Sequence, residues 1–498
     1  MGIYQGGKLS AKQFIKKNNP EKTPMKLTIL VTFYCFFLIT SCFSQHQEIN
    51  EKPAVFSGLK NQSNDSSTLL YAFKNGQYSG HFRNFFMFTE NEAGLTDYFA
   101  NAIGGGIHFN TAKFHGFELG ISGTYVFNVL SSDLAKLDPM SGQPSRYEIG
   151  LFDQENPANK KDIDRLEEFY LKYYFKKTQL TFGRQLINTP FINLQDGRMR
   201  PTSVEGIWFV SEKLKKIKMV GGWLYAISPR GTARWFGVDN SIGLYPLGVN
   251  PDGSKSNYYG NLKSNGVGLL GVTHQTTEWL KLQAWNVYVD NIFNSALFQA
   301  DIEQKVKNKK SLYLSGQFIR QDGVKNGGNE NPTKTYFTKN GKAMTFGGRF
   351  GVRWKRLDLS LNFNHITKHG RYLFPREWGR DPFFTFMPRE RNEGVGNSTA
   401  FVFKTQLNSP KYRMKTGFSA GYIQMPDVKN TALNKYAFPS YFQLNLDFRY
   451  SFSKIFKGLD AQILIVGKIA AGETYNTAKY IHNKVNMVTC NFLLNYHF

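Results

Sequence analysis

The chain ends in VTCNFLLNYHF (488–498), and this segment decides the fold. Counted back from Phe498, every second residue is aromatic, aliphatic or cysteine, whereas His497, Asn495, Asn491 and Thr489 lie between them. Successive side chains of a β-strand point to opposite faces, so this segment has one apolar face and one largely polar face. Such a two-sided strand is typical of a membrane β-barrel, in which the apolar face contacts lipid.

The same alternation recurs upstream, most clearly in residues 357–364 and 442–452, where Leu, Phe or Tyr alternate with polar residues. Tight joins, such as 176–177 and 355–356, alternate with long polar loops, such as 129–164, 229–264 and 368–396. We therefore predict an all-β fold, a transmembrane antiparallel barrel of about 18 strands with short periplasmic turns and long external loops. The predicted strands are 78–89, 98–111, 115–128, 165–176, 177–186, 202–213, 215–227, 265–273, 277–290, 294–305, 310–321, 343–354, 356–367, 397–407, 411–423, 440–452, 458–471 and 485–498.

An apolar run, residues 27–43, follows Met25-Lys26 near the N-terminus. A short basic start, an apolar middle and small residues at the end are features of a signal peptide, so we predict cleavage near Ser44 and a true start at Met25. A single membrane anchor and a lipoprotein box with lipidated Cys42 are the alternatives. The predicted organisation is an N-terminal extension and signal peptide (1–44), a polar periplasmic lead-in (45–77) and the barrel (78–498).

Composition supports a barrel over a soluble enzyme or a helical transporter. Hydrophobic residues make up only 41% of the chain, but aromatic residues reach 15%, which suits a polar lumen surrounded by aromatic girdles. After the signal, no apolar run approaches the roughly 20 residues of a spanning helix. The net charge of +25 raises the question of nucleic-acid binding, but no basic run or binding motif supports it. Contact with lipopolysaccharide or attraction of anions into a pore fits this charge better.

Motifs for catalysis, metals and cofactors are weak. Residues 266–271 match G-x-G-x-x-G, but inside a predicted strand and not at the start of a helix. His365 and His369 have a spacing that aligns ligands on a helix, not on a strand that runs into a loop. Of three cysteines only Cys490 lies clear of the signal, so no disulfide or cysteine metal site is expected. We expect no catalytic residue, metal or cofactor.

Because lipid excludes charge, strand parity assigns most ionisable residues to the lumen. The resulting wall is biased positive, and its cations would guide anions unless they only pair with nearby acids. Arg184 is an exception, since parity with Leu180 and Phe182 points it at lipid unless it lies near the interface or a bulge turns it inward. The predicted pore-lining residues are Arg83, Lys172, Arg349, Arg353, Lys404, Arg413, Lys415, Arg449 and Lys468, with the acids Glu168, Asp358 and Asp447.

Residues 187–201 form the third external loop of this topology. Opposed charges on Asp196, Arg198 and Arg200 predict a constriction that selects solutes by size and charge. The alternative is an external loop that packs on its neighbours. A further loop segment, PREWGRDP (375–382), is distinctive, and the sequence assigns it no role.

Two short stretches resemble the OprD-type outer-membrane porins. One is Phe182-Gly183-Arg184-Gln185 followed by Pro190, Asp196, Arg198, Pro201 and Glu205-Gly206, and the other is His81-Phe82-Arg83-Asn84-Phe85-Phe86, which resembles that family's first strand. The resemblance implies eighteen strands, an inward-folded third loop and a basic ladder, with uptake of small solutes that carry carboxylates. It extends to Arg83, Asp196, Arg198 and Arg200, whereas the other cations rest on parity alone.

These features predict a porin of the bacterial outer membrane through which carboxylate-bearing solutes, such as amino acids or small organic acids, diffuse passively. The expected partners are membrane lipid and lipopolysaccharide, the solutes and, through the last strand ending at Phe498, the barrel-assembly machinery. Both a monomer and a homotrimer remain open. The alternatives are an enzyme barrel, such as a lipase with Ser, His and an acid on its outer wall, and a plugged structural or adhesive barrel without conductance.

Overall fold

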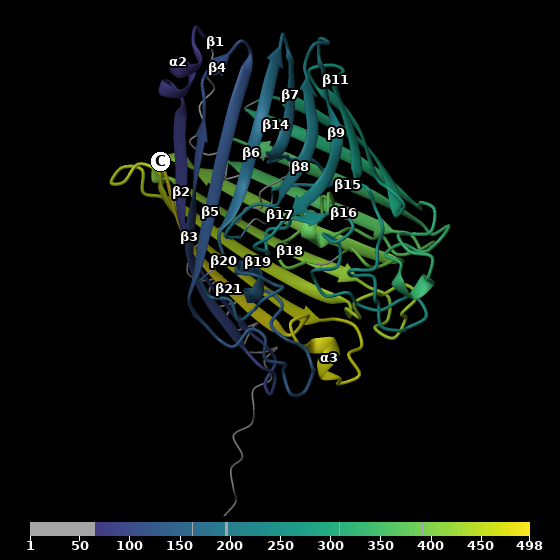
Figure 1. Ribbon diagram of the computed structural model, residues 1–498. Coiled ribbons are helices and arrows are strands. Elements are labelled where there is room, and N and C mark those ends of the chain that lie inside the picture. The colour runs from purple at the N-terminus through teal and green to yellow at the C-terminus, as the bar shows by residue number, and fades with distance from the viewer. Residues whose placement is uncertain (1–64, 162, 195–197, 308, 391) are drawn as a thin grey trace, which may run out of the picture. The chain divides into compact units, whose positions relative to one another are not determined.

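The computed structural model describes residues 65–161, 163–194, 198–307, 309–390 and 392–498, so the predicted signal peptide lies outside the described residues. Eighteen antiparallel strands pair in chain order, and the last one, β21, pairs with the first, β2, which closes a barrel (Figure 1). The strands are β2 (Gln77–Glu90), β3 (Tyr98–Asn110), β5 (Phe117–Ser131), β6 (Arg165–Phe175), β7 (Thr178–Gln185), β8 (Ser203–Ser211), β9 (Ile217–Ser228), β11 (Val267–Gln275), β12 (Leu280–Val289), β13 (Phe293–Val306), β14 (Lys310–Gly323), β15 (Lys342–Trp354), β16 (Leu357–Ile366), β17 (Ser398–Ser409), β18 (Met414–Gln424), β19 (Tyr441–Ser451), β20 (Leu459–Ala470) and β21 (Met487–His497).

The smaller elements lie at the ends of the barrel. Three two-residue strands, β1 (Asp65–Ser66), β4 (Lys113–Phe114) and β10 (Phe236–Gly237), extend the ladders. Two short helices, α2 (Leu69–Lys74) and α3 (Ala478–Ile481), lie before the first barrel strand and in the last long loop. No helix of the described residues is long and apolar enough to span a membrane.

The C-terminal strand has the two faces that its sequence predicts. On β21 the inward side chains of Thr489 and Asn491 are 0% and 1% exposed, whereas the outward rings of Phe492 and Tyr496 are 42% and 39% exposed. Buried polar and exposed aromatic residues reverse the usual order of a soluble protein. The outer wall is therefore a lipid-facing surface.

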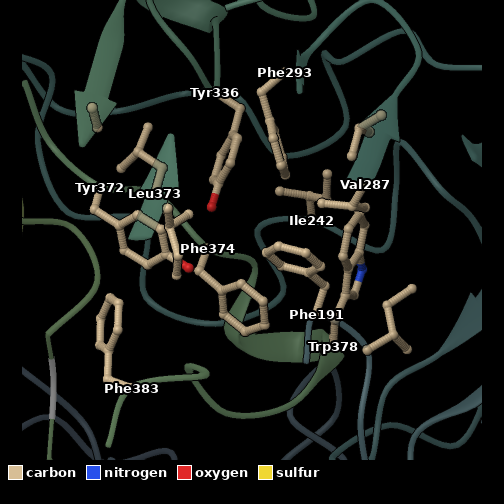
Figure 2. Packing of buried hydrophobic residues seen from close by; sticks show 14 of the residues in the cluster. Phe191, Ile242, Val287, Phe293, Tyr336, Tyr372, Leu373, Phe374, Trp378 and Phe383 are labelled. Atoms are coloured by element: carbon tan, nitrogen blue, oxygen red, sulfur yellow. The ribbon is translucent and has the colours of Figure 1, made fainter. Parts of the chain in front are cut away.

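An apolar core forms where the long loops meet inside the barrel. Figure 2 shows the packing of its side chains. The loop between β16 and β17, residues 367–397, supplies Tyr372, Phe374 and Trp378 to this core. Phe191 from residues 186–202 and Ile242 from residues 229–266 pack against them. Burying each such side chain stabilises the fold by roughly 1.5 to 3 kcal/mol. The long loops therefore pack against one another and form an ordered unit inside the barrel.

Candidate functional site

The short-turn half of the barrel encloses a cavity of about 870 Å³. Charged side chains line it, and they come in close pairs. The Nδ1 atom of His108 lies 2.9 Å from an Oε of Glu168, which also accepts a hydrogen bond from Ser122. The amine of Lys172 lies 3.1 Å from Glu118. The predicted lumen residues Glu168 and Lys172 thus line this cavity, Glu168 beside His108 and Lys172 beside Glu118.

A bulge puts a further pair on this wall, and parity could not find it. The register between β5 and β6 shifts at Ser122 and Gly123, so Glu167 and Glu168 are both buried although they are neighbours in the chain. Arg165 and Glu167 form an ion pair of 2.6 Å whose side chains are 1% and 2% exposed. Arg165 also donates to backbone carbonyls of the two loops that follow β7 and β9, which fixes these loops to the wall.

Three predicted cations, on β15 and β19, are paired with acids. Arg353 lies between Glu303, at 2.7 Å, and Asp358, at 2.9 Å. Arg349 lies 3.6 Å from Asp301 and stacks over the rings of Tyr313 and Phe384. Arg449 lies 3.1 Å from Asp447, and Arg83 donates to the side chain of Asn495 at 2.6 Å and to the carbonyl of Arg198. With Lys172, at least four of the nine predicted lumen cations are therefore compensated by an acid.

The register and the contacts place three more predicted cations. Lys404 lies opposite Ser360 and Ser419 in the ladders, and Lys415 lies opposite Arg449. Lys468 is fully buried, donates to the carbonyl of Arg389 and stands 4.7 Å from the Tyr441 ring. Lys468 therefore ties the loop 367–397 to the inner wall.

The placement of Arg413 needs a correction. The sequence assigns it to a strand, but it lies in the turn before β18, with a left-handed φ of 57° after the short helical turn Pro410–Tyr412. Strand parity therefore does not apply to Arg413, and it belongs to the short-turn end of the barrel.

Arg184 points outward, beside the exposed Leu180 and Phe182. Its charge is met by Glu205 of the neighbouring strand at 3.0 Å, and its guanidinium stacks 4.7 Å from the Trp235 ring. A paired charge under an aromatic ring is far less costly on a lipid-facing wall than a lone one.

A much smaller cavity, of about 20 Å³, lies where the loops meet. Five arginines from three loops line it, and every one of them is buried. Two acids, Asp381 and Glu390, and three aromatic residues complete the lining. The lining residues are Tyr147, Arg198, Arg230, Phe374, Arg376, Gly379, Arg380, Asp381, Phe386, Arg389 and Glu390. We call this cluster the arginine constriction.

The predicted constriction residues have different places. Arg198 lines the arginine constriction, whereas Asp196 lies outside the described residues. Arg200 is buried elsewhere and donates to the carbonyls of Ile163 and Phe152, and burial lowers its pKa to about 9. Arg200 therefore anchors the loop 132–164 and does not line the cavity.

The loop 367–397 contributes more of the constriction than the third loop does. The segment 375–382, to which the sequence assigned no role, carries Arg376, Arg380 and Asp381 into it. Its density of charged and aromatic residues was the available signal, but nothing in the sequence showed that these charges are buried. Arg230 and Arg389 were also missed, because parity is defined only on strands.

Backbone and side-chain hydrogen bonds hold this loop against the third loop and against the loop 229–266. Trp378 donates its indole N–H to Ser241 at 3.0 Å, and Asn193 exchanges two hydrogen bonds with the backbone of Arg380. Gly379 between them has φ 146°, and a Cβ there would lie 2.5 Å from Asn193. The turn therefore requires glycine, since any side chain would push Asn193 away.

Glu390 carries a perturbed carboxyl group at the constriction. Burial raises its pKa to about 8, and the neighbouring charge of Asp381 acts in the same direction. The backbone N–H of Met387 and the charges of Lys404 and Lys468 act against this rise. The charge of the constriction therefore changes near neutral pH. Among the described residues, no three His, Cys, Asp or Glu side chains gather as they would around a metal.

Comparison with known proteins agrees with this geometry. Residues 134–376 match the family model described as outer membrane porin, OprD family. The fold is similar to Pseudomonas aeruginosa OccK9 (OpdG), with a TM-score of 0.67 and 13% identity over 86% of this chain and 99% of that one. Pseudomonas aeruginosa OpdK, solved with vanillate, has a TM-score of 0.65 and 13% identity, again over 86% of this chain and 99% of that one. For Acinetobacter baumannii OccAB4 the TM-score is 0.64 and the identity 15%, over 85% of this chain and 98% of that one. No curated protein matches the chain.

Proposed function

The chain belongs to the OprD family of outer-membrane porins, and from this premise we propose that small carboxylate-bearing solutes diffuse passively through its arginine constriction. The observation that carries the proposal is the set of five buried arginines against two acids around the small cavity where the loops meet. Fixed cations at a narrow point lower the electrostatic barrier for anions, and their effect is larger where little water screens them.

Aromatic carboxylates are suitable candidates within this class. Tyr147, Phe374 and Phe386 line the constriction, and Arg389 and Arg380 stack over Tyr147 and Phe386 at 5.5 and 5.0 Å. An aromatic acid would present a ring to these side chains and a carboxylate to the guanidinium groups. Vanillate, with which the similar OpdK was solved, has this chemistry.

Planar-bilayer recording in a salt gradient tests the proposal. The wild-type channel is expected to prefer anions, and neutralising Arg198, Arg230 and Arg380 together to glutamine is expected to lower the anion-to-cation permeability ratio several-fold. Arg320→Gln is the matched control, because Arg320 lies on the outer wall, is 53% exposed and is paired with Asp322. An unchanged ratio in the triple variant would remove the selective role of the constriction.

Swelling of proteoliposomes tests the solute class separately. Vanillate and vanillyl alcohol have similar sizes and differ in the carboxylate. Faster entry of vanillate, reduced in the triple variant to the rate of the alcohol, is the expected result. Equal entry into wild-type vesicles would mean that size alone selects.

A plugged barrel is the second candidate, and one observation favours it. The arginine constriction has room for about one water molecule, since its volume is about 20 Å³. The same bilayer experiment separates the two functions, because a plugged barrel gives no conductance.

A further inference from the structure

The short turns of the barrel carry an unusual excess of positive charge. Eight turns lie at this end: 111–116, 176–177, 212–216, 276–279, 307–309, 355–356, 410–413 and 452–458. Their described residues include only two acids, Glu212 and Glu278, against fourteen basic residues. These are Lys113, Lys176, Lys177, Lys213, Lys215, Lys216, Lys307, Lys309, Lys355, Arg356, Lys411, Arg413, Lys454 and Lys457. We call these basic residues the short-turn rim.

Nothing within the described residues neutralises the short-turn rim, because none of its cations takes part in an ion pair there. Nearly all of its side chains are exposed. The opposite end is close to balance, since the described residues of its nine long loops (91–97, 132–164, 186–202, 229–266, 290–292, 324–341, 367–397, 425–440 and 471–486) have 22 basic and 18 acidic residues. The excess charge is therefore a local property of the short-turn end and not a general feature of the surface.

Several cations of this end stand directly beside outward-facing aromatic rings. Lys310, at the start of β14, and Lys355 lie 4.9 and 5.4 Å from the Trp354 ring. Lys176 lies 5.4 Å from Phe175, and Lys411 lies 5.5 Å from Tyr412. Aromatic residues at the edge of the lipid-facing wall mark the depth of the headgroups. The ammonium groups therefore reach the same depth from the water side.

The helix α2 extends the apolar wall at this end. Phe73 stacks on Phe109, at 6.3 Å, and Phe109 in turn contacts Tyr78, at 4.7 Å, on the outer face of the barrel. Leu69 and Leu70 are 57% and 65% exposed. Exposed leucines next to a lipid-facing aromatic cluster are stable when the membrane interface covers them.

We propose that the short-turn rim binds the anionic headgroups of phospholipids in the periplasmic leaflet, with α2 immersed in the same interface. The rim offers lysines and arginines to the phosphate groups, and the adjacent rings and α2 are covered by the acyl-chain boundary. Anionic lipid surfaces attract basic segments that lie next to a membrane-spanning element. A purely aqueous anionic partner would match the charge of the rim but would leave the α2 leucines in water.

Quenching of Trp354 by brominated lipids tests the proposal in proteoliposomes of the full chain. The Trp354→Phe variant supplies the background that is subtracted. Brominated phosphatidylglycerol is expected to quench Trp354 at least about threefold more strongly than brominated phosphatidylcholine, and the difference is expected to shrink at about 1 M salt because screening acts within roughly 3 Å. Equal quenching by the two lipids overturns the proposal.

A charge-matched pair of variants identifies the residues that cause the preference for the anionic lipid. Neutralising Lys309, Lys310, Lys355 and Arg356 together to glutamine is expected to bring the quenching ratio near one. Neutralising Lys136, Lys160, Lys161 and Lys255, which lie in long loops, is expected to leave it unchanged. The reverse result, or an equal fall in both variants, overturns the proposal.

Sedimentation with isolated peptidoglycan tests whether the short-turn rim binds the cell wall instead of lipid. The wild-type chain and the rim variant are expected to sediment equally. If the rim variant alone loses binding to peptidoglycan while its lipid preference is unchanged, the rim serves the cell wall and the lipid proposal is wrong.

Discussion

Arg376 and Glu393 form an ion pair of 2.8 Å inside the barrel, and their side chains are only 5% and 1% exposed. Arg376 also donates to the carbonyl of Pro246 and lies over the ring of Tyr436 at 4.4 Å. The pair thus joins the loop 367–397 to two other loops beside the arginine constriction. Breaking one partner of a buried pair leaves an uncompensated charge, which makes this contact a test of how the loops are held.

Glu393→Gln is expected to loosen the packed loops, because it leaves the Arg376 charge buried without its partner. The cost to the loop assembly is about 3 to 5 kcal/mol. The expected readouts are larger and noisier single-channel currents from a barrel whose circular dichroism is unchanged. Glu155→Gln is the control, since its partner Arg234 is 66% exposed and such a surface pair contributes at most about 1 kcal/mol. Identical currents in wild type and Glu393→Gln would mean that the pair does not hold the loops.

Arg353→Gln is expected to make the lumen wall more negative, since Glu303 and Asp358 then lose the cation between them. The anion preference should fall modestly, and the double variant Arg353→Gln/Asp358→Asn should recover part of it. Reversal potentials of the three proteins measure the effect. If Arg353→Gln and the double variant have equal potentials, the paired wall charges do not influence the passing ion.

The strands could be predicted from the sequence because two solvents act on each of them. Lipid on one side and water on the other impose a period of two, and each of the eighteen predicted segments overlaps an observed strand. The joins between strands were also predictable, since tight turns such as 176–177 leave little conformational choice.

The constriction could not be predicted in the same way, because loops have no period that fixes the direction of a side chain. Arg198 was predicted from its place in the third external loop and from a resemblance, whereas Arg380 and Arg389 depend on how the loop 367–397 folds back into the barrel. Parity also failed locally at two places on the strands. The bulge at Ser122 turned Glu167 inward beside Glu168, and the turn before β18 removed Arg413 from its strand.

The selectivity of the channel is expected to depend on pH through Glu390. Its pKa is raised to about 8, mainly by burial, so the group is neutral below that pH and negative above it. The anion preference should therefore decrease as the pH rises from about 6 to about 9, and Glu390→Gln should remove this decrease. Reversal potentials across this range measure it, with Glu278→Gln in a short turn as the control. A pH response that persists in Glu390→Gln would assign it to another group.

The free energy of unfolding is also expected to depend on pH through Glu390. A raised carboxyl pKa means that the native chain holds a proton that the unfolded chain releases between about pH 4.5 and 8. The free energy of unfolding should therefore fall as the pH rises through this window and level off above it. Glu390→Gln should flatten this slope in urea titrations at several pH values. A slope unchanged by the substitution would contradict the link between burial and titration.

The outward pair Arg184 and Glu205 is expected to behave as one unit, so that removing one charge costs more stability than removing both. Glu205→Gln leaves the Arg184 charge on the lipid-facing wall with only the Trp235 ring beside it, and such a charge costs roughly 2 to 4 kcal/mol at the bilayer midplane and less near the interface. The double variant Arg184→Leu/Glu205→Leu removes both charges and is expected to unfold in urea at a concentration close to wild type, because leucine suits lipid. Vesicle-embedded proteins are the right samples, since detergent would hydrate the arginine. If Glu205→Gln is as stable as the double variant, Arg184 finds water at this depth, and its position lies at the interface and not within the apolar band.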